Sequence, residues 1–180
     1  MPREKRDIEV VAEGRYIRML RRNDWEFVER LHITGIVVMI PVTRSGELVL
    51  IEQYRPPVDS IVIELPAGLA GDGEDKSSEG LEDAAQRELI EETGYRAGKL
   101  ELVTEGPVSP GMSAEAISLY LATDLERIGA GGGDESEDIT IYEIPLAEVH
   151  SWLEQERNKG KLLDPKVYAG VHFALRSQTR

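Results

Sequence analysis

Three glutamates at the end of one predicted helix have a type and spacing that could support metal chemistry. Residues 78–92 show helical periodicity, and the apolar positions that share one core-facing stripe are Leu81, Ala84, Ala85 and Leu89. Glu88 and Glu92 fall inside this stripe, and Glu91 lies at its edge. The opposite, water-facing side of the helix is expected to carry Asp83, Gln86 and Arg87.

Carboxylates on a core-facing stripe need compensation. Burying like charges costs several kcal/mol each or forces protonation. Positions three and four residues apart on a helix stack side by side, and a hard divalent cation such as Mg²⁺ would bind such oxygen ligands. The alternative is a short acidic stretch that tilts toward solvent at the helix end and pairs with arginines. Helical geometry alone leaves both interpretations open.

A longer pattern surrounds these glutamates. It runs Gly73, five residues, Glu79, seven residues, Arg87-Glu88-Leu89, one residue, Glu91-Glu92, Thr93 and Gly94-Tyr95. This pattern resembles the Nudix box, including its aliphatic positions. The resemblance implies hydrolysis of a nucleoside diphosphate linked to another moiety. It also implies an α/β/α sandwich with a mixed sheet, in which the box forms a loop, a helix and a second loop.

The resemblance assigns roles within and near the box. Glu88 and Glu92 would bind Mg²⁺, with Mn²⁺ as the alternative ion, and Glu91 would support them. The carbonyl oxygen of Ala67 would be a further metal ligand. The structural positions of the box would be Gly73, Glu79, Arg87 and Gly94, with the arginine paired to a box carboxylate.

Several segments outside the box resemble the ADP-ribose pyrophosphatase branch of this family. They are Trp25 to Arg30, Glu52 to Pro56, Glu64 to Gly68, Ser109 to Glu115 and Asp164 to Tyr168. The branch implies Mg²⁺-dependent cleavage of the pyrophosphate bond of ADP-ribose or a related nucleoside diphosphate sugar, giving a nucleoside monophosphate and a sugar phosphate. The alternatives are another Nudix substrate, such as a nucleoside triphosphate or a dinucleoside polyphosphate, and a non-catalytic module that senses nucleotides.

The same branch implies substrate contacts. Tyr16 and Trp25 would stack on the adenine, whereas Trp25 alone could equally be a core residue. Arg30 and Arg55 would hold the pyrophosphate, and the alternative for both is a surface ion pair. The remaining predicted substrate contacts are Glu64, Met112 and Glu115.

A loop glutamate would activate the attacking water. The candidates are Glu137 and Glu135, with Glu137 preferred, and the glycines from Gly129 to Gly133 would let this loop close over substrate. The alternative is an acidic solvated loop without chemistry.

One departure from the branch concerns spacing. There the box glycine normally ends the Pro-Ala-Gly segment, but here Gly68 lies five residues too far from Arg87. An insertion within Leu69 to Ser78 accounts for this. It leaves Glu88 and Glu92 in place and leaves the role of Glu79 and the approach of Ala67 to the metal open.

The elements that must position these residues form a mixed α/β pattern. Short alternating stretches predict an antiparallel N-terminal β region over residues 1–32, which the resemblance implies is exchanged between the subunits of a homodimer. The continuous apolar run 33–42 predicts a strand covered on both faces, with 48–52 as its hairpin partner. Further strands are expected at 61–65, 100–104, 117–122 and 139–144, and helices at 147–159 and 164–176. Residues 33–180 would form the Nudix hydrolase domain.

Composition narrows the class of protein further. The 180 residues carry a net charge of −13, which argues against sequence-independent nucleic-acid binding and leaves a small-molecule partner. The chain has no cysteine, so disulfides and zinc–thiolate sites are excluded. No apolar run approaches the roughly 20 residues of a membrane span, and the charged start lacks a signal-peptide pattern, so a cytoplasmic location is expected. Ser-His-Asp hydrolysis has no Gly-x-Ser-x-Gly turn to support it.

Overall fold

The computed structural model describes residues 8–72, 78–133 and 137–178. Its strands are β1 (Glu9–Glu13), β2 (Ile17–Arg22), β3 (Trp25–Arg30), β4 (Gly35–Pro41), β5 (Glu47–Arg55), β6 (Ser60–Glu64), β7 (Ala67–Ala70), β8 (Tyr95–Arg96), β9 (Lys99–Pro107), β10 (Ala116–Thr123), β11 (Glu126–Arg127), β12 (Thr140–Pro145) and β13 (Leu162–Leu163). Its helices are the 3₁₀ turn η1 (Pro56–Val58), α1 (Leu81–Thr93), α2 (Val149–Asn158) and α3 (Lys166–Ser177).

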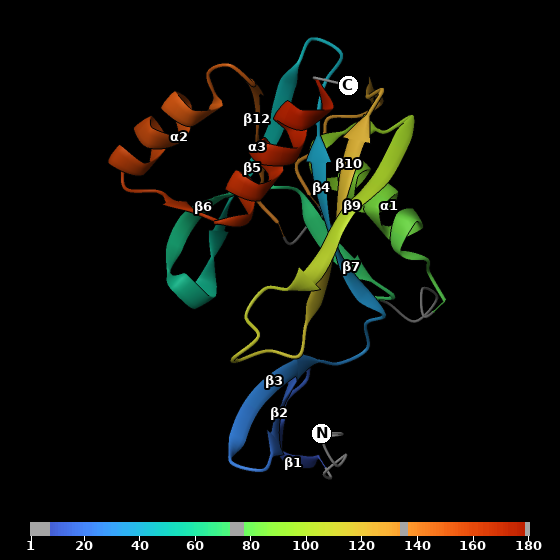
Figure 1. The fold of residues 1–180 in the computed structure, drawn as a ribbon, viewed down its shortest axis with the longest axis vertical. Coiled ribbons are helices and arrows are strands. Elements are labelled where there is room, and N and C mark those ends of the chain that lie inside the picture. Colours follow the sequence, from blue (N-terminus) through green and yellow to red (C-terminus); the bar gives the residue numbers. More distant parts are fainter. Residues whose placement is uncertain (1–7, 73–77, 134–136, 179–180) are drawn as a thin grey trace.

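The N-terminal strands form a small antiparallel sheet in the order β1-β2-β3, as predicted. The sheet stands apart from the main body in Figure 1, at the end of the molecule opposite α2 and α3. It joins the body through Val28, whose amide donates to the carbonyl of Met112 and whose carbonyl accepts from Ala114, both at 2.9 Å. This sheet therefore buries little of its own surface within one chain.

Two four-stranded sheets, β7-β4-β10-β9 and β12-β5-β6-β13, form the body. Strands β4 and β10 are parallel, as are β6 and β13, and the other pairs are antiparallel, so both sheets are mixed. Helix α1 packs against β7 and β4, and α3 packs against β4 and β6 from the other side. The expected mixed α/β Nudix-like fold is confirmed.

Strand β4 is buried on both faces, which explains its uninterrupted apolar sequence. Val38 and Ile40 face a core shared with α2 and α3, whereas Val37 and Met39 face a second core shared with α1. The prediction of a strand covered on both sides is confirmed. Because β4 is buried on both faces, one of its faces forms part of the surface on which the box helix α1 packs.

The expected hairpin between residues 33–42 and 48–52 is wrong. The turn exists, because the amide of Thr43 donates to the carbonyl of Glu47 at 2.9 Å. Beyond a single bridge between Val42 and Leu48 the two strands separate, and β5 pairs with β12 and β6 instead. Both strands are apolar on both faces, so each finds its neighbours among distant segments rather than across the turn.

Helix α1 begins three positions later than predicted, at Leu81 after Gly80. It ends at Thr93, where Gly94 adopts the left-handed conformation (φ 74°) and donates its amide to the carbonyl of Ile90 at 2.9 Å. Within the described part of the chain, no helix is long and apolar enough to cross a membrane.

Candidate active site

The packing of α1 determines which box side chains face inward. Ala85 and Leu89 are fully buried, and this rotation leaves Glu92 only 2% exposed. The side chain of Glu91 is 46% exposed, as expected for the edge of the stripe. The predicted inward orientation of Glu92 is confirmed, and a carboxylate lies among apolar side chains at the end of the helix.

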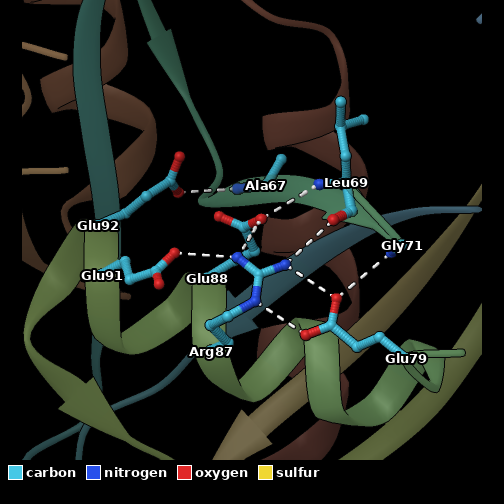
Figure 2. Close-up of polar contacts among 8 residues, drawn as sticks. All are labelled: Ala67, Leu69, Gly71, Glu79, Arg87, Glu88, Glu91 and Glu92. Atoms are coloured by element: carbon cyan, nitrogen blue, oxygen red, sulfur yellow. Dashed lines mark hydrogen bonds and ion pairs between the residues drawn. The ribbon is translucent and has the colours of Figure 1, made fainter. Parts of the chain in front are cut away.

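Arg87 joins the acidic residues of the box. Its Nε donates to Oε1 of Glu79 at 2.8 Å and its Nη1 donates to Oε1 of Glu88 at 2.8 Å and to Oε2 of Glu91 at 2.9 Å (Figure 2). Its Nη2 reaches Oε2 of Glu79 at 3.0 Å and the carbonyl of Leu69 at 3.1 Å. The hydrogen bond to Glu79 is the largest influence on the pKa of Arg87, which is raised.

The helical-wheel expectation that Arg87 faces water is therefore wrong. Its side chain is 21% exposed, because its long stem lets the guanidinium turn back over the helix toward β7. Glu79 lies beside the arginine, as the box pattern predicts. The expected structural residue Gly73, in the segment where the sequence suggests an insertion, falls outside the described residues.

Strand β7 lies directly against the inward face of α1. The amide of Ala67 donates to Oε2 of Glu92 at 2.9 Å, and the amide of Leu69 donates to Oε1 of Glu88 at 3.3 Å (Figure 2). A Cβ added to Gly68 would lie 1.9 Å from Cδ of Glu88, so a larger residue there would displace the Glu88 side chain from its observed position. The Pro-Ala-Gly segment thus orients both carboxylates, and Ala67 does so through its amide.

Burial raises the pKa of both carboxyl groups. It raises the pKa of Glu92 to about 9; the amide of Ala67 opposes this shift, and the charges of Glu137 and Glu88 add to it. Burial also raises the pKa of Glu88, and the guanidinium of Arg87 opposes it. Neither group has enough positive charge beside it to balance its burial.

The donor set of these residues fits a hard divalent cation. In the part of the chain that the structure describes, no three acidic or histidine side chains already converge as a metal site. Mg²⁺ commonly uses only one or two protein carboxylates and completes its shell with waters and substrate phosphates. Glu92, which is buried, and Glu88, which is partly buried, are both undercompensated and satisfy that requirement.

A cavity of about 520 Å³ opens beside these carboxylates. Residues from β3, β4, β5, β7, α1, β10, α3 and three loops line it: Arg30, Ile36, Val38, Arg55, Ala67, Gly68, Leu69, Asp72, Arg87, Glu88, Glu91, Val108, Glu115, Ile117, Glu137 and Lys166. Its volume is within the range of small-molecule sites. Eight predicted site residues meet here: Arg30, Arg55, Ala67, Arg87, Glu88, Glu91, Glu115 and Glu137. The predicted metal ligand Glu92 is not on the lining.

The two arginines predicted to hold a pyrophosphate lie on the cavity wall, and each pairs with a carboxylate. Arg30 Nε lies 2.8 Å from Oε1 of Glu115. Arg55 contacts Glu64 through three hydrogen bonds of 2.5 to 3.1 Å, and Glu64 is 8% exposed. These pairs orient two guanidinium groups toward one space, so the predicted substrate residues Glu64 and Glu115 are placed next to the arginines.

Glu137 also lines the cavity. Burial lowers the pKa of Arg55, but its bond to Glu64 and the charges of Glu64, Glu92 and Glu137 outweigh this and raise it. Glu137 therefore lies within electrostatic reach of both Arg55 and Glu92. The other candidate base, Glu135, falls outside the described residues.

Four predicted substrate residues do not line this cavity. One of them, Glu64, is paired with Arg55, which does. The other three, Tyr16, Trp25 and Met112, are exposed by 64%, 61% and 63% respectively, on or beside the N-terminal sheet. The alternative of Trp25 as a core residue is wrong. Lys166 also lines the cavity and was not among the predicted site residues. Its position within Asp164 to Tyr168, a segment that resembles the ADP-ribose pyrophosphatase branch, could have indicated it.

A pair of undercompensated carboxylates beside a cavity with two arginines on its wall is suited to binding a divalent cation and a phosphorylated ligand. The NUDIX domain family matches residues 33–165, and the chain belongs to the Nudix family.

The comparison with curated proteins finds relatives of similar length. An ADP-ribose pyrophosphatase of Bacillus subtilis is 34% identical over 140 residues, which cover 77% of this chain and 71% of the relative. A methanol dehydrogenase activator of Bacillus methanolicus has the same identity and coverage. A GDP-mannose pyrophosphatase of Cronobacter sakazakii is 36% identical over 151 residues, covering 79% of this chain and 74% of that protein.

Among solved structures, the crystal structure of an ADP compounds hydrolase matches with a TM-score of 0.68. It is 23% identical, and the match covers 96% of this chain and 91% of the other. At this identity the likeness supports the fold alone.

Proposed function

We propose that this protein hydrolyses the pyrophosphate bond of ADP-ribose or a related nucleoside diphosphate sugar with the help of Mg²⁺. The observation that carries the proposal is a pair of undercompensated carboxylates: Glu92 is buried, and Glu88 lies on the wall of a cavity that also presents Arg30 and Arg55. The pyrophosphatases among the relatives, at 34–36% identity, favour a nucleoside diphosphate sugar over a nucleoside triphosphate.

The residues of the chain divide the chemistry between them. Glu88 and Glu92 would hold the divalent cation, with the main chain at Ala67 as a further candidate ligand and Glu91 in support. The bound cation would neutralise charge on the phosphates and make a bound water more acidic. Arg30 and Arg55 would bind the two phosphoryl groups and fix the line of attack.

Glu137 would accept the proton of the attacking water. It lies on the same cavity as the arginines and within electrostatic reach of Glu92. A carboxylate at this position completes the set of groups that phosphoanhydride hydrolysis needs: a cation, fixed phosphates and a proton acceptor.

The exposed N-terminal sheet supports a homodimer. Six apolar or aromatic side chains on or next to this sheet are at least 39% exposed: Ile8, Val10, Val11, Tyr16, Ile17 and Trp25. An apolar surface of this kind on a small sheet marks an interaction site. Residues 1–32 would cross to a second Nudix domain, residues 33–180, where Tyr16, Trp25 and Met112 would contact the base of the substrate.

The substrate assignment is tested by offering the purified protein ADP-ribose, GDP-mannose, UDP-glucose and nucleoside triphosphates with Mg²⁺ and identifying the products by mass. The expected result is AMP plus ribose 5-phosphate, or the matching pair from another nucleotide sugar. Hydrolysis of triphosphates alone would contradict the substrate class. Tight binding of nucleotides with no turnover would contradict enzymatic function and favour a sensing module.

A further inference from the structure

The glycine-rich segment Gly129–Gly133 is attached to the end of the box helix by backbone hydrogen bonds. The amide of Gly132 donates to the carbonyl of Glu92 at 2.9 Å, and the amide of Gly133 donates to the carbonyl of Glu91 at 3.0 Å. The amide of Gly129 donates to the carbonyl of Gly94 at 3.1 Å. The segment therefore satisfies the last carbonyls of α1, which have no partner within the helix.

The attachment requires glycine where the two backbones meet. Gly131 has a φ of +71°, and a Cβ added there would lie 2.4 Å from the carbonyl carbon of Thr93 and 2.7 Å from the amide nitrogen of Gly94. A Cβ added to Gly94 would lie 2.3 Å from the carbonyl oxygen of Gly129. Because the obstructing atoms are backbone, a methyl group at Gly131 cannot be accommodated by a side-chain rotation.

The same segment contacts the candidate base. A Cβ added to Gly133 would lie 2.6 Å from Oε2 and 2.7 Å from Cβ of Glu137. The side chain of Glu137 thus packs on the backbone that caps Glu91 and Glu92. A continuous set of contacts joins the helix that carries the box carboxylates to the Glu137 carboxylate, which also lines the cavity.

We infer that Gly131 is a positioning residue, which sets the place of Glu137 relative to Glu92 by seating the glycine segment on the end of α1. This inference rests on the proposed role of Glu137 as proton acceptor. It differs from a glycine hinge that lets the loop close, because the described glycines are engaged in backbone contacts. The glycine segment would fix the distance between Glu92, on α1, and Glu137, in the loop before β12.

The test compares Gly131→Ala with Gly129→Ala, in the wild-type and the Glu137→Gln backgrounds. Gly129 provides the matched control, because it lies in the same segment and a Cβ there would meet only Cα of Gly94, at 3.9 Å. In Gly131→Ala we expect kcat to fall about 10- to 100-fold, as expected for a catalytic group misplaced by about 1 Å. The KM and the Mg²⁺ concentration for half-maximal rate should stay within about threefold of wild type.

The double variant provides the readout that a purely structural role would not give. If Gly131 acts through Glu137, adding Gly131→Ala to Glu137→Gln should change the residual kcat less than about twofold. An equal further loss in that background, or a weakened Mg²⁺ dependence, would show that the change acts through α1 and would overturn the inference. Full activity of Gly131→Ala beside an inactive Glu137→Gln would overturn the inference and leave the proposed function intact.

Two further outcomes are distinguishable. Wild-type activity in Glu137→Gln would overturn the assignment of the base, and the inference with it. If Gly131→Ala does not fold by circular dichroism, Gly133→Ala replaces it, because the nearest atoms that its methyl group would meet belong to the side chains of Glu137 and Ile139. We then expect Gly133→Ala to lower kcat by the same factor in the wild-type background and not in the Glu137→Gln background. An unchanged kcat in the wild-type background would overturn the inference.

Discussion

The amide of Ala67 donates a hydrogen bond of 2.9 Å to Oε2 of Glu92, joining β7 to the last turn of α1. This hydrogen bond comes from a neutral amide and is the nearest interaction that stabilises the negative charge of Glu92, a residue that is only 2% exposed. A neutral amide offsets only part of the free energy needed to bury a negative charge. This incomplete compensation supports the proposal that a divalent cation binds here.

The pH dependence of stability should reveal this cost. Because the pKa of Glu92 in the folded protein, about 9, lies above its ordinary value of 4.5, the folded state holds this proton more tightly than the unfolded state. The resulting stabilisation is present below the ordinary pKa and is lost as the pH rises toward 9. Without metal, Glu92→Gln should gain more than about 1 kcal/mol over wild type between pH 5 and pH 9.

Urea denaturation of both proteins in EDTA, at several pH values in this window, measures that difference. Glutamine can still accept the hydrogen bond from Ala67, so the comparison isolates the charge. Parallel curves of unfolding free energy against pH would contradict an uncompensated Glu92.

Addition of Mg²⁺ should reverse the effect. At 100 times its dissociation constant, an ion that binds only the folded state adds about 2.7 kcal/mol of stability. The wild-type melting temperature should rise with Mg²⁺ at pH 8 and return with EDTA, while that of Glu92→Gln should change little. Equal shifts in the two proteins would place the ion elsewhere.

The sequence predicted the elements that depend on local pattern. The apolar run of β4, the stripe of α1 and the glycine end of that helix were all readable, because each follows from periodicity or from one backbone conformation. The pairing of β5 could not be predicted, because the sequence of a strand that is apolar on both faces does not indicate which strand it pairs with. The short strands β7, β8, β11 and β13 were likewise missed, since four residues or fewer give too little pattern.

For the site, the box spacing predicted which side chains gather, and the fold shows what holds them. Arg87 was placed toward water by the helical wheel, which locates Cβ but not the end of a long side chain. The pairs Arg30–Glu115 and Arg55–Glu64 join residues 85 and 9 positions apart, and only the folded chain shows them. The contact of Gly131 with the end of α1 depends on backbone geometry that no residue pattern encodes.

Close packing between Gly68 and Glu88 gives a third prediction. The methyl group of Gly68→Ala would displace the Glu88 carboxylate, so activity should fall on the order of 100-fold, with a cost in stability of about 1–3 kcal/mol. Gly106→Ala is the control, because a Cβ there meets nothing within 4 Å. Steady-state kinetics and thermal denaturation measure both effects. A Gly68→Ala enzyme with unchanged kinetics would show that Glu88 need not hold its observed position.

The exposed Trp25 gives a fourth prediction. If it stacks on the base in a dimer, Trp25→Ala should raise KM by roughly 5- to 100-fold, since stacking contributes about 1–3 kcal/mol per base. The stability of the folded chain should change little, because the side chain is 61% exposed. Leu102→Ala, at an exposed position of β9, serves as control. An unchanged KM would remove Trp25 from the substrate site.

Metal-assisted hydrolysis at Glu92 is the central feature of the proposed function. The most direct measurement is the rate of AMP release from ADP-ribose at saturating Mg²⁺, for the wild-type protein, for Glu92→Gln and for wild type in EDTA. We expect turnover by the wild-type protein with Mg²⁺, and a rate lower by on the order of 100-fold or more in the other two samples. A Glu92→Gln enzyme that releases AMP at nearly the wild-type rate would contradict the proposed function.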